Sequence, residues 1–502
     1  MKVRIKIASW VLPLLLSAPW SVPTPAGAFT TNTVEKVADL FSGKDLIGNI
    51  YGGYNPESRF TQVGTNLWFT TAGGGLNGDG TISTFSLISH EVTQVAYLDK
   101  NTSGKAPDSP ILVINETNGY FTTTQGGSTS NKGTIVKIDL PSGTLTTLHA
   151  FTNTDGATPR TGLTEIGNEL WTMTAMGGTS NKGTIVKYNL DTDITTVVTN
   201  FDGPNIGGYP YANPVYYDNA WYFTTFIGGT NNPAGASLGC GAFDRLTFDD
   251  QGNPLITKLI DMPNGYGRGP CGSPLLVGTN SFYFLTTGPT TNPGAIYRYD
   301  LDTGLGTNLF SFTTNADAVL QDGKVPGYNG LTEWQGELYF LTRQGGISNV
   351  GVVAKFNIAS NTVVKLADLD GKGPLALGYE MGGFNNDGLV VQETNRFFIY
   401  YTVYAGGAYG SGSGYGTILR IYLPPLPIQA AIAPADPDSL TVSWSGGYPP
   451  FDIVTNNDLT IPVDSWPVAV TGIDSAVNTT NWSATLPVPG GPTFYRIRGQ
   501  TQ

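Results

Sequence analysis

Histidine, cysteine and methionine are scarce in this sequence, whose 502 residues include two histidines, two cysteines and five methionines. So few imidazoles argue against a Ser-His-Asp triad, a histidine general base or a histidine-ligated metal. His90 is expected in a turn between outer strands and His149 within an outer strand, where both have structural roles. Two thiols without a neighbouring histidine also fall short of the usual four zinc ligands, so we expect no metal centre.

Charge is sparse as well, because only 13% of the residues are Asp, Glu, Lys or Arg. Acidic residues outnumber basic ones by 38 to 26, which gives a formal net charge of −12. Nucleic acids and anionic lipids are bound mainly through Lys and Arg, so this composition disfavours both as partners. Disorder is also disfavoured, since 40% of the residues are hydrophobic and can form a core.

Long apolar runs are missing. The apolar run "WVLPLLL" (Trp10–Leu16) is interrupted by Pro13 and is shorter than the roughly 18 residues that a membrane-spanning helix needs. Basic residues at positions 2, 4 and 6 precede it, and Ala-Gly-Ala at 26–28 fits the cleavage rule for secretory signals. The sequence therefore predicts a signal peptide at residues 1–28, a mature chain without a transmembrane segment, and a secreted, periplasmic or cell-surface location.

Glycine and proline, in contrast, are abundant, with 66 and 33 residues, and 11% of the residues are aromatic. This composition is typical of short strands joined by tight turns, and it predicts an all-β fold. The nine residues "TSNKGTIVK" occur at Thr129–Lys137 and again at Thr179–Lys187. They belong to a pattern found seven times: an aromatic-rich strand, a diglycine, and a strand that begins G-[TAV]-[IVF].

A second pattern, G-x-x-P, precedes each of the seven strand pairs. It occurs at Gly53–Pro56, Gly104–Pro107, Gly156–Pro159, Gly207–Pro210, Gly267–Pro270, Gly323–Pro326 and Gly371–Pro374. Further strand-like segments follow each proline and each G-T-I strand, so a unit of about fifty residues has four strands, as a propeller blade does. We therefore expect a seven-bladed β-propeller, with "SNKG" as the turn between the second and third strands.

The domain boundaries follow from where the repeat begins and ends. Residues 29–424 are expected to form the propeller, with a strand at 34–41 completing the last blade because its sequence resembles the fourth strand of the sixth unit. Residues 425–432 form a predicted linker rich in proline and alanine. Residues 433–502 contain about five alternating segments, which predict a small β-sandwich similar to a fibronectin type III or immunoglobulin domain.

The segments "YFTTTQGGSTSNKGTIVKI" and "LWTMTAMGGTSNKGTIVKY" resemble the choice-of-anchor tandem repeats of GloVer type found in bacterial exported proteins. The diglycine also resembles that of kelch repeats, although the kelch tryptophan pattern is missing. The resemblance covers roughly residues 60–423 and implies an exported propeller, often with a C-terminal attachment or sorting module. It implies no established activity and no catalytic residues.

Cys240 and Cys271 are the only cysteines, and two cysteines in an exported protein are usually joined. Both are expected on connections at the same face of the ring, so a disulfide would join the fourth and fifth blades. The segments "NGDGT" from Asn77 and "DLDTG" from Asp300 are partly similar to calcium loops but lack the full ligand spacing. We interpret them as turns, with no cofactor expected and a structural calcium ion as the minor alternative.

The face that carries the G-x-x-P and diglycine loops is the predicted binding surface, because loops on a rigid scaffold commonly hold binding residues. Aromatic rings stack on sugars and arginine pairs with carboxylates, so this surface fits a glycan with acidic groups. The candidate ligand-binding residues are Tyr54, Arg59, Arg160, Tyr209, Tyr211, Arg268, Lys324, Tyr328, Lys372, Tyr379 and Glu380. The same tyrosines and cations could instead pack the turns and relieve the acidic surface.

The sequence thus predicts an exported binding, adhesion or scaffold protein whose partner is a carbohydrate or an envelope protein. The alternative is a carbohydrate-active enzyme, either a polysaccharide lyase or a glycoside hydrolase that uses two carboxylates. Five glutamates near the inner strands or their loops are the candidates for such a pair: Glu57, Glu116, Glu165, Glu333 and Glu380.

Overall fold

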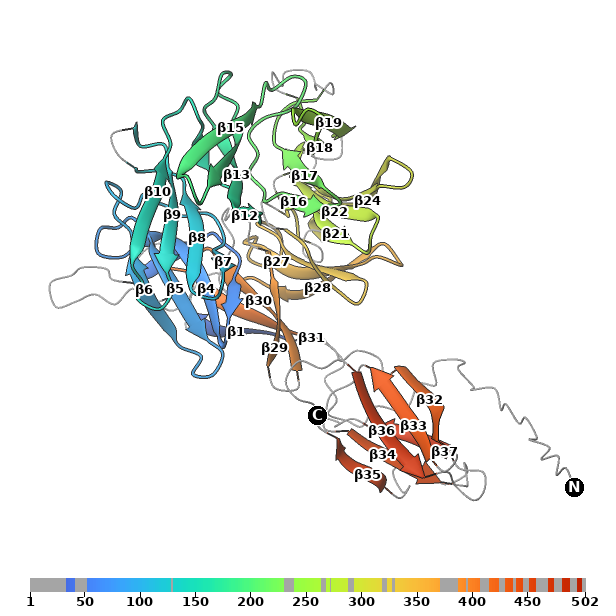
Figure 1. Cartoon of the computed structure of the whole chain (residues 1–502). Coiled ribbons are helices and arrows are strands. Elements are labelled where there is room, and N and C mark those ends of the chain that lie inside the picture. Colours follow the sequence, from blue (N-terminus) through green and yellow to red (C-terminus); the bar gives the residue numbers. More distant parts are fainter. Residues whose placement is uncertain are drawn as a thin grey trace, which may run out of the picture. The chain divides into compact units, whose positions relative to one another are not determined.

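Seven small antiparallel sheets form a β-propeller, and two further sheets lie in the C-terminal part of the chain. Figure 1 shows the seven sheets arranged in a ring, with the inner strands toward its middle. This computed structural model describes residues 33–40, 52–127, 130–229, 239–262, 268–270, 272–287, 293–317, 323–326, 330–370, 387–393, 396–406, 415–423, 429–436, 439–445, 451–456, 468–473, 481–487 and 494–498. The predicted signal peptide lies outside these residues.

The first four blades follow one another along the chain. Blade 1 contains β2 (Gly53–Pro56), β3 (Thr61–Val63), β4 (Asn66–Gly74), β5 (Thr81–Ser86) and β6 (Val92–Tyr97). Blade 2 contains β7 (Leu112–Ile114), β8 (Asn118–Thr123), β9 (Thr134–Asp139) and β10 (Leu145–Ala150). Blade 3 contains β11 (Ala157–Pro159), β12 (Thr164–Ile166), β13 (Glu169–Met176), β14 (Thr184–Asn189) and β15 (Ile194–Asn200). Blade 4 contains β16 (Val215–Tyr217), β17 (Ala220–Thr225), β18 (Ala242–Phe248) and β19 (Pro254–Asp261).

The remaining three blades repeat this arrangement, which gives the seven blades that the sequence predicts. Blade 5 contains β20 (Arg268–Pro270), β21 (Leu275–Val277), β22 (Ser281–Thr287), β23 (Ala295–Asp300) and β24 (Leu305–Ser311). Blade 6 contains β25 (Thr332–Trp334), β26 (Glu337–Leu341), β27 (Val352–Asn357) and β28 (Thr362–Asp368). Blade 7 contains β29 (Leu389–Glu393), β30 (Arg396–Val403), β31 (Thr417–Leu423) and β1 (Val34–Asp39).

The core of the propeller lies between neighbouring blades. One cluster, for example, combines Ile82 and Leu98 of blade 1 with Phe121 and Val136 of blade 2, all fully buried. Both faces of the middle strands are covered in this way, and all six residues of β17 are buried. This explains the nearly continuous apolar runs in the sequence, since a sheet with one exposed face would alternate.

In every blade, a large apolar residue directly follows the outer strand. Its backbone N–H donates to the carbonyl oxygen of the glycine that directly precedes the third strand, and this distance is 3.0 Å in all seven blades. None of these side chains is more than 3% exposed. We call them the plug residues: Leu40, Leu98, Phe151, Phe201, Met262, Phe312 and Leu369.

The G-x-x-P segments join neighbouring blades. In the six that the structure describes, the residue before the proline has a φ between 50° and 54° and donates its N–H to the preceding blade over 2.7–3.2 Å. Thr158 and Val325 are among these residues, although β-branched side chains disfavour positive φ. The proline packs on the glycine that directly precedes the third strand of the preceding blade. For example, a Cβ atom added to Gly133 would lie only 2.7 Å from Cδ of Pro159. This repeated contact, the inter-blade clamp, offsets the backbone strain.

The repeated "SNKG" forms the turn between the second and third strands, as the sequence predicts. Asn131 and Asn181 both have positive φ, and their Oδ1 atoms accept the N–H of the first diglycine residue at 2.7 and 3.0 Å. Asn349 makes the same contact in blade 6 at 3.1 Å. The duplicated sequence therefore forms the same turn in blades 2 and 3.

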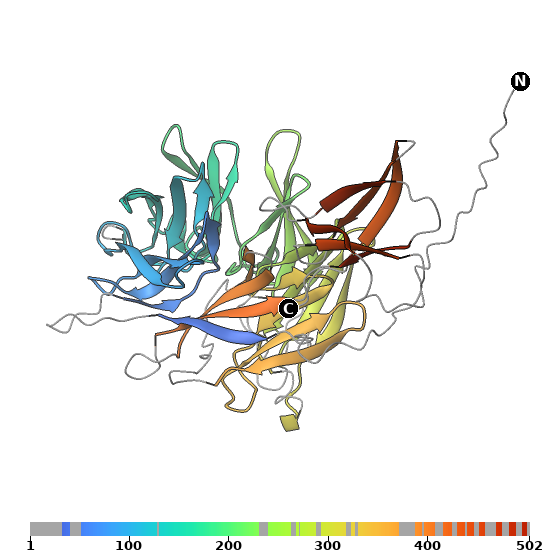
Figure 2. The same cartoon turned by 90° about the horizontal axis from the view of Figure 1, so that it is seen from below.

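The strand β1 pairs antiparallel with β31, so the outer strand of blade 7 comes from the N-terminal part of the chain. The register runs from Val34 opposite Ile421 to Asp39 opposite Thr417. Figures 1 and 2 show β1, in dark blue, beside the orange strands of this blade. Closure of blade 7 in this way removes a free sheet edge.

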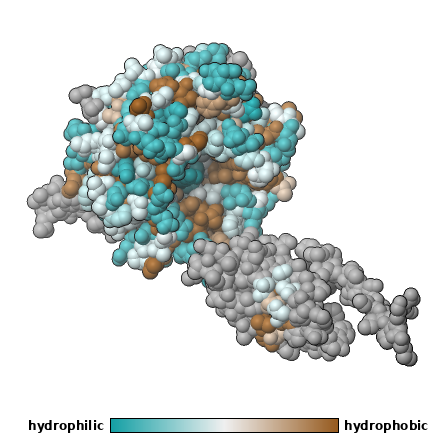
Figure 3. All heavy atoms as spheres, viewed as in Figure 1, coloured by the Kyte–Doolittle hydropathy of each residue, from teal (hydrophilic) through white to brown (hydrophobic). Residues whose placement is uncertain are grey.

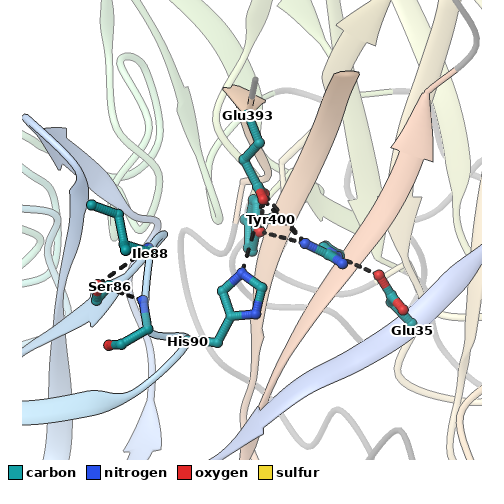
Figure 4. A network of polar contacts seen from close by, with 8 residues as sticks. Glu35, Ser86, Ile88, His90, Glu393 and Tyr400 are labelled. Atoms are coloured by element: carbon teal, nitrogen blue, oxygen red, sulfur yellow. Dashed lines mark hydrogen bonds and ion pairs between the residues drawn. The ribbon is translucent and has the colours of Figure 1, made fainter. Parts of the chain in front are cut away.

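A polar network joins β1, blade 7 and blade 1 on the side of the strand hairpins (Figure 4). Arg420 pairs with Glu35 of β1 and, over 3.2 Å, with Glu393 of β29. The Tyr400 hydroxyl donates to Glu393, and Nε2 of His90, from the β5–β6 turn, lies 3.9 Å from the same carboxylate. His90 thus belongs to an outer turn, as expected, and contributes to the junction of blades 7 and 1.

The second compact unit contains residues 428–502, and the propeller lies within residues 32–427. The C-terminal strands form two three-stranded sheets, with orders β32-β33-β36 and β35-β34-β37. Their bounds are β32 (Gln429–Asp436), β33 (Ser439–Ser445), β34 (Phe451–Asn456), β35 (Val468–Ile473), β36 (Asn481–Pro487) and β37 (Phe494–Arg498). Strand β32 begins inside residues 425–432, the segment predicted to be a linker.

Candidate ligand-binding site

The residues that follow the clamp prolines contact one another through four consecutive blades. Arg160 of blade 3 donates from Nη1 to Oδ2 of Asp108 of blade 2 over 2.9 Å. The Glu57 side chain of blade 1 forms a hydrogen bond with the Asp108 carboxyl group. The Arg160 guanidinium lies 5.7 Å from the ring centroid of Tyr211 of blade 4, within cation–π range. One position of the repeat therefore forms a polar arc on the loop face.

Burial raises the pKa of the Asp108 carboxyl group, although the charge of Arg160 and the hydrogen bond of Glu57 act to lower it. Catalytic carboxyls of glycosidases lie roughly 5–9.5 Å apart, with the glycosidic bond between them. Glu57 and Asp108 are in direct contact, so their geometry does not fit that role.

Predicted site residues also gather in an aromatic and cationic cluster at blades 3 and 4. The rings of Tyr209 and Tyr211 are stacked, with centroids 6.4 Å apart and an interplanar angle of 16°. Nζ of Lys182 donates to the Tyr209 hydroxyl over 2.9 Å and lies 4.7 Å from its ring centroid. The ring of Phe226 also packs near Tyr211, with ring centroids 5.4 Å apart. Arg160, Tyr209 and Tyr211 therefore come together, as expected for residues of one face.

A cavity of about 630 Å³ lies in the middle of the ring and receives residues from six of the seven blades. Figure 3 shows a hollow near the centre of the propeller. The volume is within the range of about 300–1,000 Å³ that is typical of small-ligand sites. The polar and aromatic lining residues are Arg59, Thr164, Asn213, Tyr216, Ser273, Thr332, Glu333 and Asp387.

Arg59 and Asp387 are the charged pair of this cavity, from the adjacent blades 1 and 7. Arg59 is exposed, and no hydrogen bond or close ion pair joins it to another residue in the part of the chain that the structure describes. Asp387 is 8% exposed, and its Oδ1 has no hydrogen-bond partner among the described residues. Burial raises the pKa of Asp387, while the charge of Arg59 and a hydrogen bond from Ser273 act in the opposite direction.

The opposite wall of the cavity comes from blade 4, which lies across a seven-bladed ring from the junction of blades 7 and 1. Tyr216 of β16 lines this wall and is 42% exposed. Its ring contacts Trp221 with centroids 5.4 Å apart, so the neighbouring strand supports it. An exposed and supported tyrosine ring can stack on the face of a sugar.

The other predicted residues have different environments. Tyr54 packs over Gly73, where a Cβ would lie 2.2 Å from the ring, and its ring centroid is 5.6 Å from that of Tyr415. Lys324 forms a β-bridge with Gln344. Five predicted residues lie wholly outside the described residues or have side chains outside them: Arg268, Tyr328, Lys372, Tyr379 and Glu380. For these the binding role stays a prediction.

The cysteine pair is only half described. Cys240 is buried at 1% exposure, and Cys271 lies outside the described residues. Gly269, two residues before Cys271 in the sequence, donates its N–H to the Cys240 carbonyl oxygen over 2.7 Å. The disulfide therefore stays a prediction.

The other glutamates considered for catalysis lie in separate environments. Glu116 has positive φ in an exposed turn, and Glu165 is exposed. Oε1 of Glu333 accepts the N–H of Gly336 over 2.8 Å in the β25–β26 turn, although Glu333 also lines the cavity. Glu380 lies outside the described residues.

The aspartates of the two calcium-like segments also have turn roles. Oδ2 of Asp79 accepts the N–H of Lys100 over 2.9 Å, and Oδ1 of Asp300 accepts the N–H and hydroxyl of Thr303. Within the described ranges, no group of three or more His, Cys, Asp or Glu residues is placed to hold a metal ion.

His149 lies in the outer strand β10, where its Nε2 is 2.9 Å from Oδ2 of Asp155. Partial burial acts to raise the pKa of Asp155, but hydrogen bonds from His149 and Thr152 hold it below its usual value. Asp155 directly precedes the G-x-x-P segment Gly156–Pro159, and its carbonyl oxygen accepts a hydrogen bond from the Thr184 hydroxyl. Together the two contacts hold the start of this segment in place. This histidine therefore has a structural role away from the cavity.

The fold and the central cavity define the chain's larger unit as a seven-bladed β-propeller built from sequence repeats. Residues 29–186 match the family model described as the Gloeobacter/Verrucomicrobia repeat, which confirms the resemblance seen in the repeat motifs. No curated protein matches this sequence. In the described residues, no helix has the length and apolar character required to cross a membrane.

Three solved structures illustrate the distant likeness of the fold. The extracellular domain of the putative one component system BT4673 from B. thetaiotaomicron is 12% identical, with a TM-score of 0.46, and the match covers 80% of this chain and 42% of that one. An oligogalacturonate lyase in complex with manganese is 11% identical, with a TM-score of 0.43 and coverage of 78% and 98%. The β-propeller domain of the Trilobed protease from Pyrococcus furiosus is 10% identical, with a TM-score of 0.37 and coverage of 73% and 93%. Likenesses this distant carry no argument about function.

Sequence reasoning missed Asp387, Asn213 and Ser273, which line the cavity. Asn213 and Ser273 occupy equivalent positions, three residues after the clamp prolines Pro210 and Pro270, and Arg59 has the same spacing from Pro56. That spacing was a usable signal. Asp387 is separated from its G-x-x-P by a longer segment, so the repeat offered no such guide.

Proposed function

We propose that this protein is an exported β-propeller that binds a glycan in the central cavity and on the loop face around it. The observation that carries the proposal is the cavity of about 630 Å³, whose lining combines an exposed arginine, hydroxyl and amide groups, and an exposed tyrosine. Sugars are commonly bound by such a combination of stacking and hydrogen bonding. An envelope protein that carries such a glycan is an equally suitable partner.

The C-terminal unit and the signal peptide complete this proposal. The two three-stranded sheets would pack as a small sandwich of fibronectin III or immunoglobulin type and serve as a tether or second binding module. Cleavage after Ala28 would deliver the protein to the periplasm, the cell surface or the medium. N-terminal sequencing of protein from the native host should then begin at Phe29, whereas an uncleaved N-terminus would contradict export by this route.

A glycoside hydrolase is the second candidate, because Asp387 and Glu333 line the same cavity. Asp387 has the raised pKa of a general acid. Glu333, however, is engaged with the backbone of its turn, and Asp387 is almost completely buried. These contacts favour binding over hydrolysis, and the absence of a catalytic histidine is compatible with either function.

A glycan array probed with the full mature protein, followed by product analysis, tests both candidates. Retention of one glycan class without turnover is expected. Release of reducing ends or of unsaturated products would establish an enzyme instead, and failure to retain any glycan would overturn the proposal. The variant Glu333→Gln identifies the source of any hydrolysis, because it removes a carboxylate while its amide oxygen can still accept the turn hydrogen bond.

A further inference from the structure

We infer that the cavity selects a uronic-acid sugar, with the sugar carboxylate on Arg59, a ring hydroxyl on Asp387 and the sugar ring against Tyr216. This inference rests on the proposed glycan-binding function and adds the chemical class of the ligand and the residues that recognise it. No hydrogen bond or close ion pair joins any two of these three residues in the described structure, and Arg59 and Tyr216 are exposed.

Arg59 supplies the recognition of the anion. Its guanidinium faces the cavity without an ion pair or hydrogen bond in the described residues, in a chain whose net charge is −12. Two other arginines of the propeller do have ion-pair partners: Arg160 pairs with Asp108, and Arg420 pairs with Glu35 and Glu393. A guanidinium binds a carboxylate through two parallel N–H donors, which gives both affinity and orientation.

Asp387 supplies the second contact. Its Oδ1 is buried without a hydrogen-bond partner, which is costly unless a ligand or water satisfies it. A hydroxyl group can donate to an ionised carboxylate or accept from a protonated one, so a polyhydroxylated ligand suits this atom in either state. Ser273, Thr164 and Thr332 add hydroxyl groups to the lining of the cavity.

The two contacts together define the ligand more closely than either does alone. A simple inorganic anion would satisfy Arg59 and leave Asp387 unpaired, whereas a neutral sugar would do the reverse. A uronic acid carries a carboxylate, several hydroxyls and an apolar ring face in one molecule, and so it offers a partner to each of these three side chains. Glu333, the other carboxylate of the lining, is held at its turn by the Gly336 N–H.

Calorimetric titration of the full mature protein tests this inference. Oligosaccharides of galacturonate and of glucuronate are compared with the same sugars as methyl esters, and free glutamate is the non-sugar anion. We expect the acidic sugars to bind at least about tenfold more tightly than their esters, with affinity that falls as salt is added. Preference for glutamate over both sugars would show that the site recognises an amino acid and would overturn the inference.

Variants assign the effect to the cavity. Arg59→Ala should abolish the difference in affinity between acid and ester. Arg59→Lys should retain part of this difference, because lysine keeps the positive charge but lacks the two parallel N–H donors of the guanidinium. Asp387→Asn should weaken the binding of both acid and ester severalfold. Arg396→Ala, which removes an exposed arginine outside the cavity, is the matched control and should change nothing. Thermal melting checks that each variant is folded.

The outcomes separate this inference from the proposed function. If the wild-type protein binds no glycan, the proposed function fails. If it binds acids and esters equally, or if Arg59→Ala keeps the preference, glycan binding stands and the assignment of a uronic acid to this cavity is wrong.

Discussion

The plug residue Leu40 offers a direct measure of how firmly the N-terminal strand is built into the propeller. It is 2% exposed and packs in a cluster that includes Phe60, Phe69 and Ile418. Removal of a buried leucine side chain costs about 2–5 kcal/mol, and the cost is highest where rigid neighbours cannot fill the space. Because two of these neighbours are fully or almost fully buried aromatic rings, we expect Leu40→Ala to lower the free energy of unfolding by about 3–4 kcal/mol.

The matched variant is Leu98→Ala in blade 1. Leu98 has the same position in its blade, the same 3.0 Å backbone hydrogen bond and 0% exposure, but its strand is continuous in sequence with the blade it completes. Urea denaturation followed by tryptophan fluorescence compares the two, since the chain has nine tryptophans. Similar losses are expected. If β1 can leave without global unfolding, Leu40→Ala will cost less than about 1 kcal/mol while Leu98→Ala still costs several, and the reasoning about closure would be wrong.

Three further predictions concern the backbone, the pH dependence and the cysteines. Gly133→Ala places a Cβ 2.2 Å from a backbone carbonyl oxygen at a φ of 98° and should lower the free energy of unfolding by about 3 kcal/mol or more in urea titration, whereas Gly167→Ala, with a φ of 61° and open space around it, should cost only about 1–2 kcal/mol. Asp155→Asn should destabilise the protein by about 1–2 kcal/mol at neutral pH, because a carboxylate whose pKa is lowered by folding stabilises the fold at any pH above its pKa in the unfolded chain. The difference in stability from wild type should fade as the pH falls below about 4. Thermal melts that show a constant difference across this pH range would contradict the prediction. In oxidised, denatured protein, Cys240 and Cys271 should react with iodoacetamide only after reduction, and two labels without reductant would exclude the disulfide.

The seven-bladed fold was predictable because its signals are local and repeated. The asparagine of the turn before the third strand has the same role in blades 2, 3 and 6, and G-x-x-P precedes every strand pair, so the recurrence itself reveals the architecture even where single motifs are weak. The placement of Tyr209 and Tyr211 on one face also follows from the repeat, whereas the stacking of their rings was not predicted.

Other features depend on contacts between blades and leave little trace in the sequence. Residues before the clamp prolines include Thr158 and Val325, which have no preference for positive φ, and the conformation is imposed by a hydrogen bond to the preceding blade. Glu57 and Arg160 were predicted as site residues of the loop face, but their shared contact with Asp108 was not predicted. Asp387 reaches the cavity from a segment that departs from the repeat spacing, so only the folded chain brings it near Arg59.

The pairing of β1 with β31 also sets an order on how this chain acquires its structure. Glu35 and Arg420 are 385 positions apart, and six blades lie between them in the sequence. A growing or translocating chain can assemble those blades one by one, but its earliest strand has to wait unpaired until the final repeat has emerged. Completion of the ring therefore reports that the whole repeat array is present, and a chain truncated before β31 would keep an open, adhesive edge that quality-control proteases and chaperones can recognise.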